Sequence, residues 1–172
     1  WIGTENGLSR FDDRQDVDRQ DVGESFTSFT TADGLPHRQV RTMARDQRGQ
    51  LWIGTREGVS CYDGRNFTSL TYEDGLINNQ VISLIQDRAG DFWFGTFVGM
   101  SQYSQSFSSF TTGDGLVHDD LRAITRDSKG RLWFGSLGGL SECDPRRSPG
   151  RCFTNYTTDD GLAHNRVFAV VE

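Results

Sequence analysis

The three histidines of this chain occupy one repeated sequence position. His37, His118 and His164 each lie two residues after an Asp-Gly-Leu triplet, and Asn78 takes the same place after another such triplet. Imidazole nitrogens can bind a metal ion, so a symmetric set of them is a candidate metal site. If the repeated units of the chain form a ring, however, these residues lie at its rim and are too far apart for ligands that must each approach one ion to about 2 Å. We therefore interpret the four residues as turn formers and expect no metal and no cofactor.

An acidic stretch at residues 12–24 is the other place where a metal could bind. Carboxylates such as Asp16 and Asp18 could coordinate Ca²⁺, which prefers several oxygen ligands. The spacing matches no calcium loop, and Arg14 and Arg19 offset the charge, so a solvated loop is the alternative that we prefer. The sequence shows no nucleophile elbow and no H-E-x-x-H helix, and we predict no catalytic residues.

A tight turn follows each of the four tryptophans by a few residues, and apolar residues occupy two of these four turns. The turns at residues 5–6 and 56–57 are polar, whereas those at 97–98 and 137–138 are apolar. Exposed apolar patches often mark ligand or partner surfaces. Cover by a flanking segment is the alternative. Together with their neighbours in the repeat frame, the candidate ligand-binding residues are Phe97, Val98, Leu137, His118, Ile77 and Val117.

Four arginines recur in the first strand-like run of two units: Arg41, Arg45, Arg122 and Arg126. If these runs line a central channel, the guanidinium groups could favour an anionic ligand. Arginines that are solvated or lie at the edge of a sheet are the alternative, and this is the interpretation that we favour.

The cysteines allow one disulfide. Cys143 and Cys152 flank a loop rich in proline and arginine, and a bond between them could staple one hairpin in an oxidising compartment. In the alternative interpretation both are reduced, and Cys143 fills a slot that Tyr62 and Tyr103 hold in other units. Cys61 has no evident partner.

A fixed repeat positions all of these residues. The aspartates of the triplets at Asp33, Asp74 and Asp114 each precede a tryptophan by 19 positions. Such a period is typical of units that bury their apolar faces only by stacking on one another. We divide the chain 1–172 into a partial unit 1–32, units 33–73, 74–113 and 114–159, and a partial unit 160–172.

Each unit contains four short strand-like runs separated by turns. In the second unit they are 40–45, 51–55, 59–62 and 67–71, with a D-x-x-G turn after the first and a glycine-containing turn after the second. None of the runs has the 3.6-residue period of a helix. The pattern predicts an all-β fold, a β-propeller with four-stranded antiparallel blades. We expect 16 strands, the last at 167–172, forming an arc of a larger ring; a ring closed between residues 166–171 and 1–4 is the alternative.

Composition excludes some classes of partner. A net charge of −6 argues against nucleic acid, which is bound through basic surfaces. No apolar run reaches the roughly 20 residues that cross a bilayer, so we expect no direct membrane contact from this segment. Because the chain opens on Trp1 in the middle of a repeat, we interpret it as a piece of a longer protein.

The repeat resembles a known family, the two-component regulator propeller of bacterial sensor proteins. The resemblance rests on Phe67-Thr68, Asp74-Gly75-Leu76, Asn79, Val81, Leu84, Asp87, Gly90, Trp93-Phe94-Gly95-Thr96, Gly99-Met100 and Tyr103. It implies a periplasmic sensory region, adjoining propeller and signalling domains, rings of about seven blades, and a response to oligosaccharides in some members. Ser104 departs from the pattern, since the other units have aspartate there.

We therefore predict a non-enzymatic recognition module that detects a small-molecule or glycan ligand. One alternative is a propeller lyase of the streptogramin-inactivating type, whose Gly-x-Leu-Trp-Phe run is similar to one in this chain. The other is a scaffold for protein–protein interaction.

Overall fold

The structure of the chain, a computed structural model, describes residues 1–12, 25–147 and 152–172. Its strands form one three-stranded and three four-stranded antiparallel sheets. The first sheet contains β1 (Ile2–Thr4), β2 (Gly7–Asp12) and β3 (Ser25–Phe29). The second contains β4 (Val40–Arg45), β5 (Leu51–Thr55), β6 (Gly58–Tyr62) and β7 (Phe67–Leu70).

The third sheet contains β8 (Ser83–Gln86), β9 (Phe92–Thr96), β10 (Gly99–Tyr103) and β11 (Phe107–Phe110). The fourth contains β12 (Leu121–Arg126), β13 (Leu132–Ser136), β14 (Leu140–Cys143) and β15 (Phe153–Tyr156). A single turn of 3-10 helix links each sheet to the segment that follows it: η1 (Thr31–Asp33), η2 (Tyr72–Asp74), η3 (Thr112–Asp114) and η4 (Thr158–Asp160).

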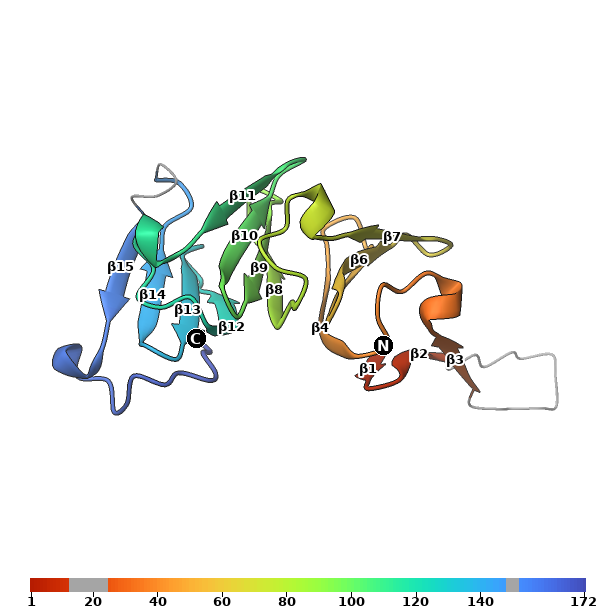
Figure 1. The fold of residues 1–172 in the computed structure, drawn as a ribbon, viewed down its shortest axis with the longest axis horizontal. Helices are drawn as coiled ribbons and strands as arrows, with labels where there is room; N and C mark the ends of the chain where they lie inside the picture. Colours follow the sequence, from red (N-terminus) through yellow and green to blue (C-terminus); the bar gives the residue numbers. More distant parts are fainter. Residues whose placement is uncertain (13–24, 148–151) are drawn as a thin grey trace.

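The sheets follow one another along a curved row, and the two termini lie apart (Figure 1). Strand β8 contacts both β4 and β12, and β4 also contacts β1, so the first strand of each sheet lies on the inner side of the curve. This radial arrangement of antiparallel sheets is that of a β-propeller arc, and it confirms the predicted all-β fold class.

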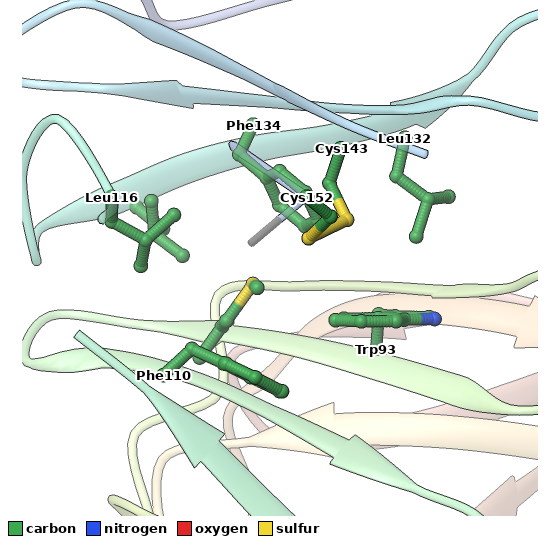
Figure 2. Close-up of a cluster of buried hydrophobic side chains, with 9 residues drawn as sticks. Trp93, Phe110, Leu116, Leu132, Phe134, Cys143 and Cys152 are labelled. Atoms are coloured by element: carbon green, nitrogen blue, oxygen red, sulfur yellow. A yellow bond between two sulfur atoms is a disulfide. The ribbon is translucent and has the colours of Figure 1, made fainter. Parts of the chain in front are cut away.

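The hydrophobic core lies between the sheets. Each cluster of buried residues combines the tryptophan of one sheet with apolar residues of the next. Figure 2 shows one such junction, in which Trp93 and Phe110 face Leu132, Phe134 and Cys143. A sheet therefore buries both of its faces only when it has a neighbour on each side.

The D-x-x-G turns are tied to these tryptophans. The carboxylate of Asp87 accepts hydrogen bonds from the backbone amides of Ala89, Gly90 and Asp91, and its second oxygen accepts one from Trp93 Nε1 at 2.9 Å. The same indole bond recurs from Trp52 to Asp46 and from Trp133 to Asp127. One aspartate in each unit thus shapes the turn and orients the residue that fills the junction.

Two aspartates of the fourth sheet have strongly lowered pKa values. Burial raises the pKa of Asp127, but hydrogen bonds from Trp133 and Arg131 outweigh burial and lower this pKa to about 2. The pKa of Asp144 is also about 2, chiefly because the Arg146 side chain donates hydrogen bonds to its carboxylate. Both groups are ionised in the folded chain over most of the acidic range.

A glycine in each tryptophan strand lets the sheets approach closely. A Cβ placed on Gly95 would lie 2.5 Å from Ser83 Oγ in the same sheet and 3.3 Å from Leu121 Cβ in the next sheet. Real Cβ atoms do not tolerate the shorter distance. Gly95 is therefore required for packing at this position.

The expected sixteenth strand is absent from the described part of the chain, which contains 15 strands. Residues 167–172 pack against β13, where Val167 N donates to Ser136 O at 2.7 Å, as Val81 N donates to Thr55 O at 3.0 Å in the second sheet. The segment takes the place of a first strand but has no further strand beside it, and a strand is defined by its ladder. The termini do not pair, in agreement with an arc.

Candidate functional site

The loops that follow each sheet share one local structure. In the second loop, Asp74 Oδ2 accepts a hydrogen bond from Thr71 N at 2.8 Å, and Thr71 Oγ1 accepts one from Glu73 N at 3.3 Å. This capping box starts η2, and Gly75 ends it with a φ of 108°. All four loops repeat this arrangement. The sequence pattern predicted turns here and did not predict the short 3-10 helices. We call the side of the arc that carries them the loop face.

The histidines form hydrogen bonds within these loops. His37, His118 and His164 each accept a hydrogen bond through Nδ1 from the amide two residues further on, at 2.9 Å, and Asn78 Oδ1 does so at 2.8 Å. One ring nitrogen of each histidine is therefore used within its turn. Among residues 1–12, 25–147 and 152–172, no three His, Cys, Asp or Glu side chains come together in a way that could hold a metal ion.

Phe97 lies at the tip of the β9–β10 turn, half-buried between two arginines. The guanidinium carbon of Arg122 lies 4.8 Å from the centre of the Phe97 ring, and that of Arg41 lies 5.7 Å away. Both distances fall within the range of cation–π attraction. Arg41 comes from the second sheet and Arg122 from the fourth, so this cluster, which we call the Phe97 cluster, spans three sheets.

Backbone irregularities position both arginines. The register of β4 on β5 shifts between Val40 and Thr42, and that of β12 on β13 shifts between Leu121 and Ala123. Each shift places the intervening arginine on a bulge, a feature that redirects a side chain out of the regular alternation of a strand.

The two arginines differ in charge balance. Arg122 forms a two-point ion pair with Asp120, with Nε–Oδ1 and Nη2–Oδ2 distances of 2.7 and 2.8 Å. Arg41 is exposed, and no carboxylate of the described residues pairs with it. The cluster therefore has a free positive charge on the side of Arg41, next to a half-exposed aromatic ring.

Most of the other predicted ligand-binding residues take part in packing on the loop face. Ile77 and Val117 are half-buried and lean over the next hairpin turn, where Ile77 Cδ1 would lie 2.9 Å from a Cβ on Gly99. The His118 ring lies against Gly138. Val98 is 45% exposed, and Leu137 is half-buried. Among these candidates Val98 is the most exposed, and Phe97, Leu137, Ile77 and Val117 each leave part of their side chain at the surface.

Sequence reasoning treated Phe97 and the arginines as separate features and missed their convergence. A signal was present, because Arg41 and Arg122 occupy one repeat position in the units on either side of Phe97. No feature of the sequence indicates the bulges that turn Arg41 and Arg122 toward the Phe97 ring. Arg45 and Arg126 end their strands away from the cluster, and Arg126 Nη1 donates to Gln86 O at 2.8 Å.

The structure joins Cys143 and Cys152 in a disulfide, with a Cα–Cα distance of 4.7 Å, inside the core between the third and fourth sheets. Cys61 is free, and burial raises the pKa of its thiol to about 11, with a smaller contribution from Asp46 and Asp63. The acidic stretch with Asp16 and Asp18 falls within residues 13–24, outside the described part of the chain.

No helix in the described parts of the chain is both long enough and apolar enough to cross a bilayer. Residues 34–57, 75–97 and 115–138 match the family described as Two component regulator propeller. A stretch of 39 residues is 49% identical to Histidine kinase P4 of Formosa agariphila, over 23% of this chain and 3% of that protein.

Two solved structures illustrate the range of similar folds. The extracellular domain of the hybrid two component system BT3049 from B. thetaiotaomicron superposes with a TM-score of 0.76 and 23% identity, over 94% of this chain and 22% of that one. Virginiamycin B lyase from Staphylococcus aureus gives a TM-score of 0.59 and 12% identity, over 77% of this chain and 45% of that one. The chain spans less than half the length of each of these three proteins.

Proposed function

We propose that this chain, three segments of which match the two-component regulator propeller family, is a sensory module of a bacterial two-component signalling protein. It lies outside the cytoplasm, binds a small-molecule or glycan ligand without transforming it, and passes the event to adjoining propeller and signalling domains. The similarity to Histidine kinase P4 and to the extracellular domain of BT3049 supports this role.

The observation that carries the proposal is the Phe97 cluster. A half-exposed aromatic ring held between arginines of both neighbouring sheets offers stacking surface and an unpaired positive charge at one place. Aromatic residues, phenylalanine among them, and arginine are enriched at recognition surfaces. Val98 and Leu137 extend this surface, while Ile77, Val117 and His118 support the loops around it.

The non-enzymatic interpretation is supported by what the histidines do. Each histidine accepts a hydrogen bond through Nδ1 inside its own turn, and this structural role accounts for its recurrence in the repeat without a catalytic one. Turnover assays with a streptogramin, combined with metal analysis of the purified chain, test this interpretation. Ring opening of the antibiotic by the chain would reject it.

Substitution of Phe97 tests the ligand site. Burial of a phenylalanine side chain against a ligand contributes about 1.5–3 kcal/mol, so Phe97→Ala is expected to weaken binding by about tenfold to a hundredfold. Binding is measured by titration calorimetry with the best ligand of a glycan and metabolite panel.

The matched control is Arg56→Ala, which changes the same turn position in the second sheet. We expect this variant to bind like the unmodified chain, and both variants to keep the same thermal unfolding midpoint. Unaltered binding by Phe97→Ala would reject the site.

A further inference from the structure

A cavity of about 610 Å³ lies between the second and third sheets, beside the D-x-x-G turns and therefore on the side opposite the loop face. Its volume falls within the range of small-molecule sites. Four glutamines line it: Gln47, Gln50, Gln86 and Gln105. We call it the glutamine cavity.

Two small residues of the second sheet open this cavity. Cys61 pairs with Trp52 in the ladder, and the residues at the same place in the other sheets are the longer Arg10, Gln102 and Glu142. Leu70 pairs with Val59, and the residues at the same place in the other sheets are the aromatic Phe29, Phe110 and Tyr156.

The next junction shows the effect of the larger side chains. There Phe110 is 5% exposed and packs on Trp93, with ring centres 5.8 Å apart. Leu70 in the second sheet leaves the corresponding volume open, and it lines the cavity together with Cys61. The cavity is thus a departure of one unit from the repeat.

Most polar groups of the cavity are uncharged, and its charged side chains are Asp46, Asp91 and the exposed Arg48, which together carry one net negative charge and disfavour an anionic ligand. The side-chain amides of Gln50 and Gln105 form no hydrogen bond with the described residues, so each can both donate and accept. The carboxylate of Asp46 is occupied by its own turn and by Trp52 Nε1, and that of Asp91 accepts from Gln102. Leu70 and Tyr103 add half-buried apolar surface.

Gln105 occupies a conformation that disfavours any side chain. Its φ is 86°, and it is the one non-glycine residue with positive φ among residues 1–12, 25–147 and 152–172. The corresponding turn of the second sheet has Gly64, with a φ of 102°. Residues held in such conformations are concentrated at functional sites, because selection keeps the side chain despite its strain.

We propose that the glutamine cavity is a binding site for a neutral small molecule whose amide or hydroxyl groups both donate and accept hydrogen bonds. The free amides of Gln50 and Gln105 pair with these groups, and Leu70 contacts the apolar part of the ligand. This site is separate from the Phe97 cluster, so Phe97→Ala leaves binding in the cavity unchanged, and the two proposals fail independently.

Two neutral probes test the proposal on the full chain. N-acetyl-leucinamide represents amide ligands and methyl glucoside represents hydroxyl ligands, while N-acetyl-leucine carries a negative charge and serves as the control. Binding is followed through the side-chain amide resonances of Gln50 and Gln105 in ¹H–¹⁵N spectra. We expect saturable shifts with one neutral probe, which identifies the chemical class, and much weaker shifts with the charged control. The absence of shifts with both neutral probes, or equal binding of the charged control, would overturn the proposal.

Filling the cavity provides the location test. Cys61→Gln and Leu70→Phe introduce the residues that the third sheet has at these places, so the sheet is expected to keep its fold. Both variants should abolish the shifts while the unfolding midpoint is kept. Binding that survives in the double variant would place the ligand elsewhere and reject the cavity.

Gln105→Gly separates a ligand role from a structural one. The change relieves the strained backbone and removes one hydrogen-bonding group, so we expect a higher unfolding midpoint together with about fivefold weaker binding. The reciprocal variant Gly64→Gln should lower stability and leave binding unchanged. A fall in stability on Gln105→Gly, or unchanged binding, would contradict the assignment.

Discussion

The hydrogen bond between Asp87 and Trp93 predicts a large loss of stability on Asp87→Ala. Asp87 is 1% exposed and accepts four hydrogen bonds, from Trp93 Nε1 and the amides of Ala89, Gly90 and Asp91. Leaving the buried indole N–H without an acceptor costs about 1–3 kcal/mol, and loss of the turn bonds, partly replaced by water, adds about 1–2 kcal/mol. We expect the free energy of unfolding to fall by about 2–5 kcal/mol, against a typical total of about 5–15 kcal/mol.

Urea unfolding followed by far-UV circular dichroism measures this change, and the chain contains its own control. Asp46→Ala removes the same group in the second sheet, where Trp52 Nε1 lies 3.3 Å from Asp46 Oδ2 and the carboxylate is half-buried. The loss should therefore be smaller than for Asp87→Ala. Asp87→Asn keeps one acceptor oxygen, so its loss of stability should also be smaller than that of Asp87→Ala. Equal losses at both positions, or no loss on Asp87→Ala, would refute the reasoning.

Two further predictions concern pH and packing. Asp127 and Asp144 have pKa values of about 2 in the folded chain, against about 3.9 in an unfolded one. Their stabilising contribution is complete above about pH 4 and is lost as the pH falls through about 2, so the urea midpoint should decline in that window, and less steeply in Asp144→Asn. Gly95→Ala should lower the free energy of unfolding by about 1–3 kcal/mol because its Cβ meets Ser83 Oγ, whereas Gly113→Ala should have little effect; similar unfolding curves for the two variants would contradict this account.

The repeat frame could be predicted because the same physical requirements recur in every unit. Tight turns need Asp and Gly at fixed places, and each junction needs a tryptophan, so Asp87, Gly90 and Trp93 locate the strands around them. The final strand was predicted wrongly for the opposite reason. Residues 167–172 have the pattern of a first strand, but a strand also requires a partner that the pattern of one segment does not specify.

The candidate sites were less predictable because they depend on departures from the repeat. The arginines of the Phe97 cluster lie on bulges, and a bulge follows from the pairing of two strands, which residue types alone do not specify. The glutamine cavity depends on the absence of bulk at Cys61 and Leu70. Volume that is missing between two sheets becomes visible only when their side chains are placed together.

The loops on the loop face repeat one backbone with almost no variation. The capping threonines of the four loops have φ values of −129°, −132°, −133° and −133°, and the closing glycines lie between 101° and 110°. The hairpin tips beside them nevertheless present Glu5, Arg56, Phe97 and Leu137. Because the backbone is nearly constant while the tips differ, we expect that exchanging the two tip residues between sheets would change the side chains on the loop face without altering its backbone.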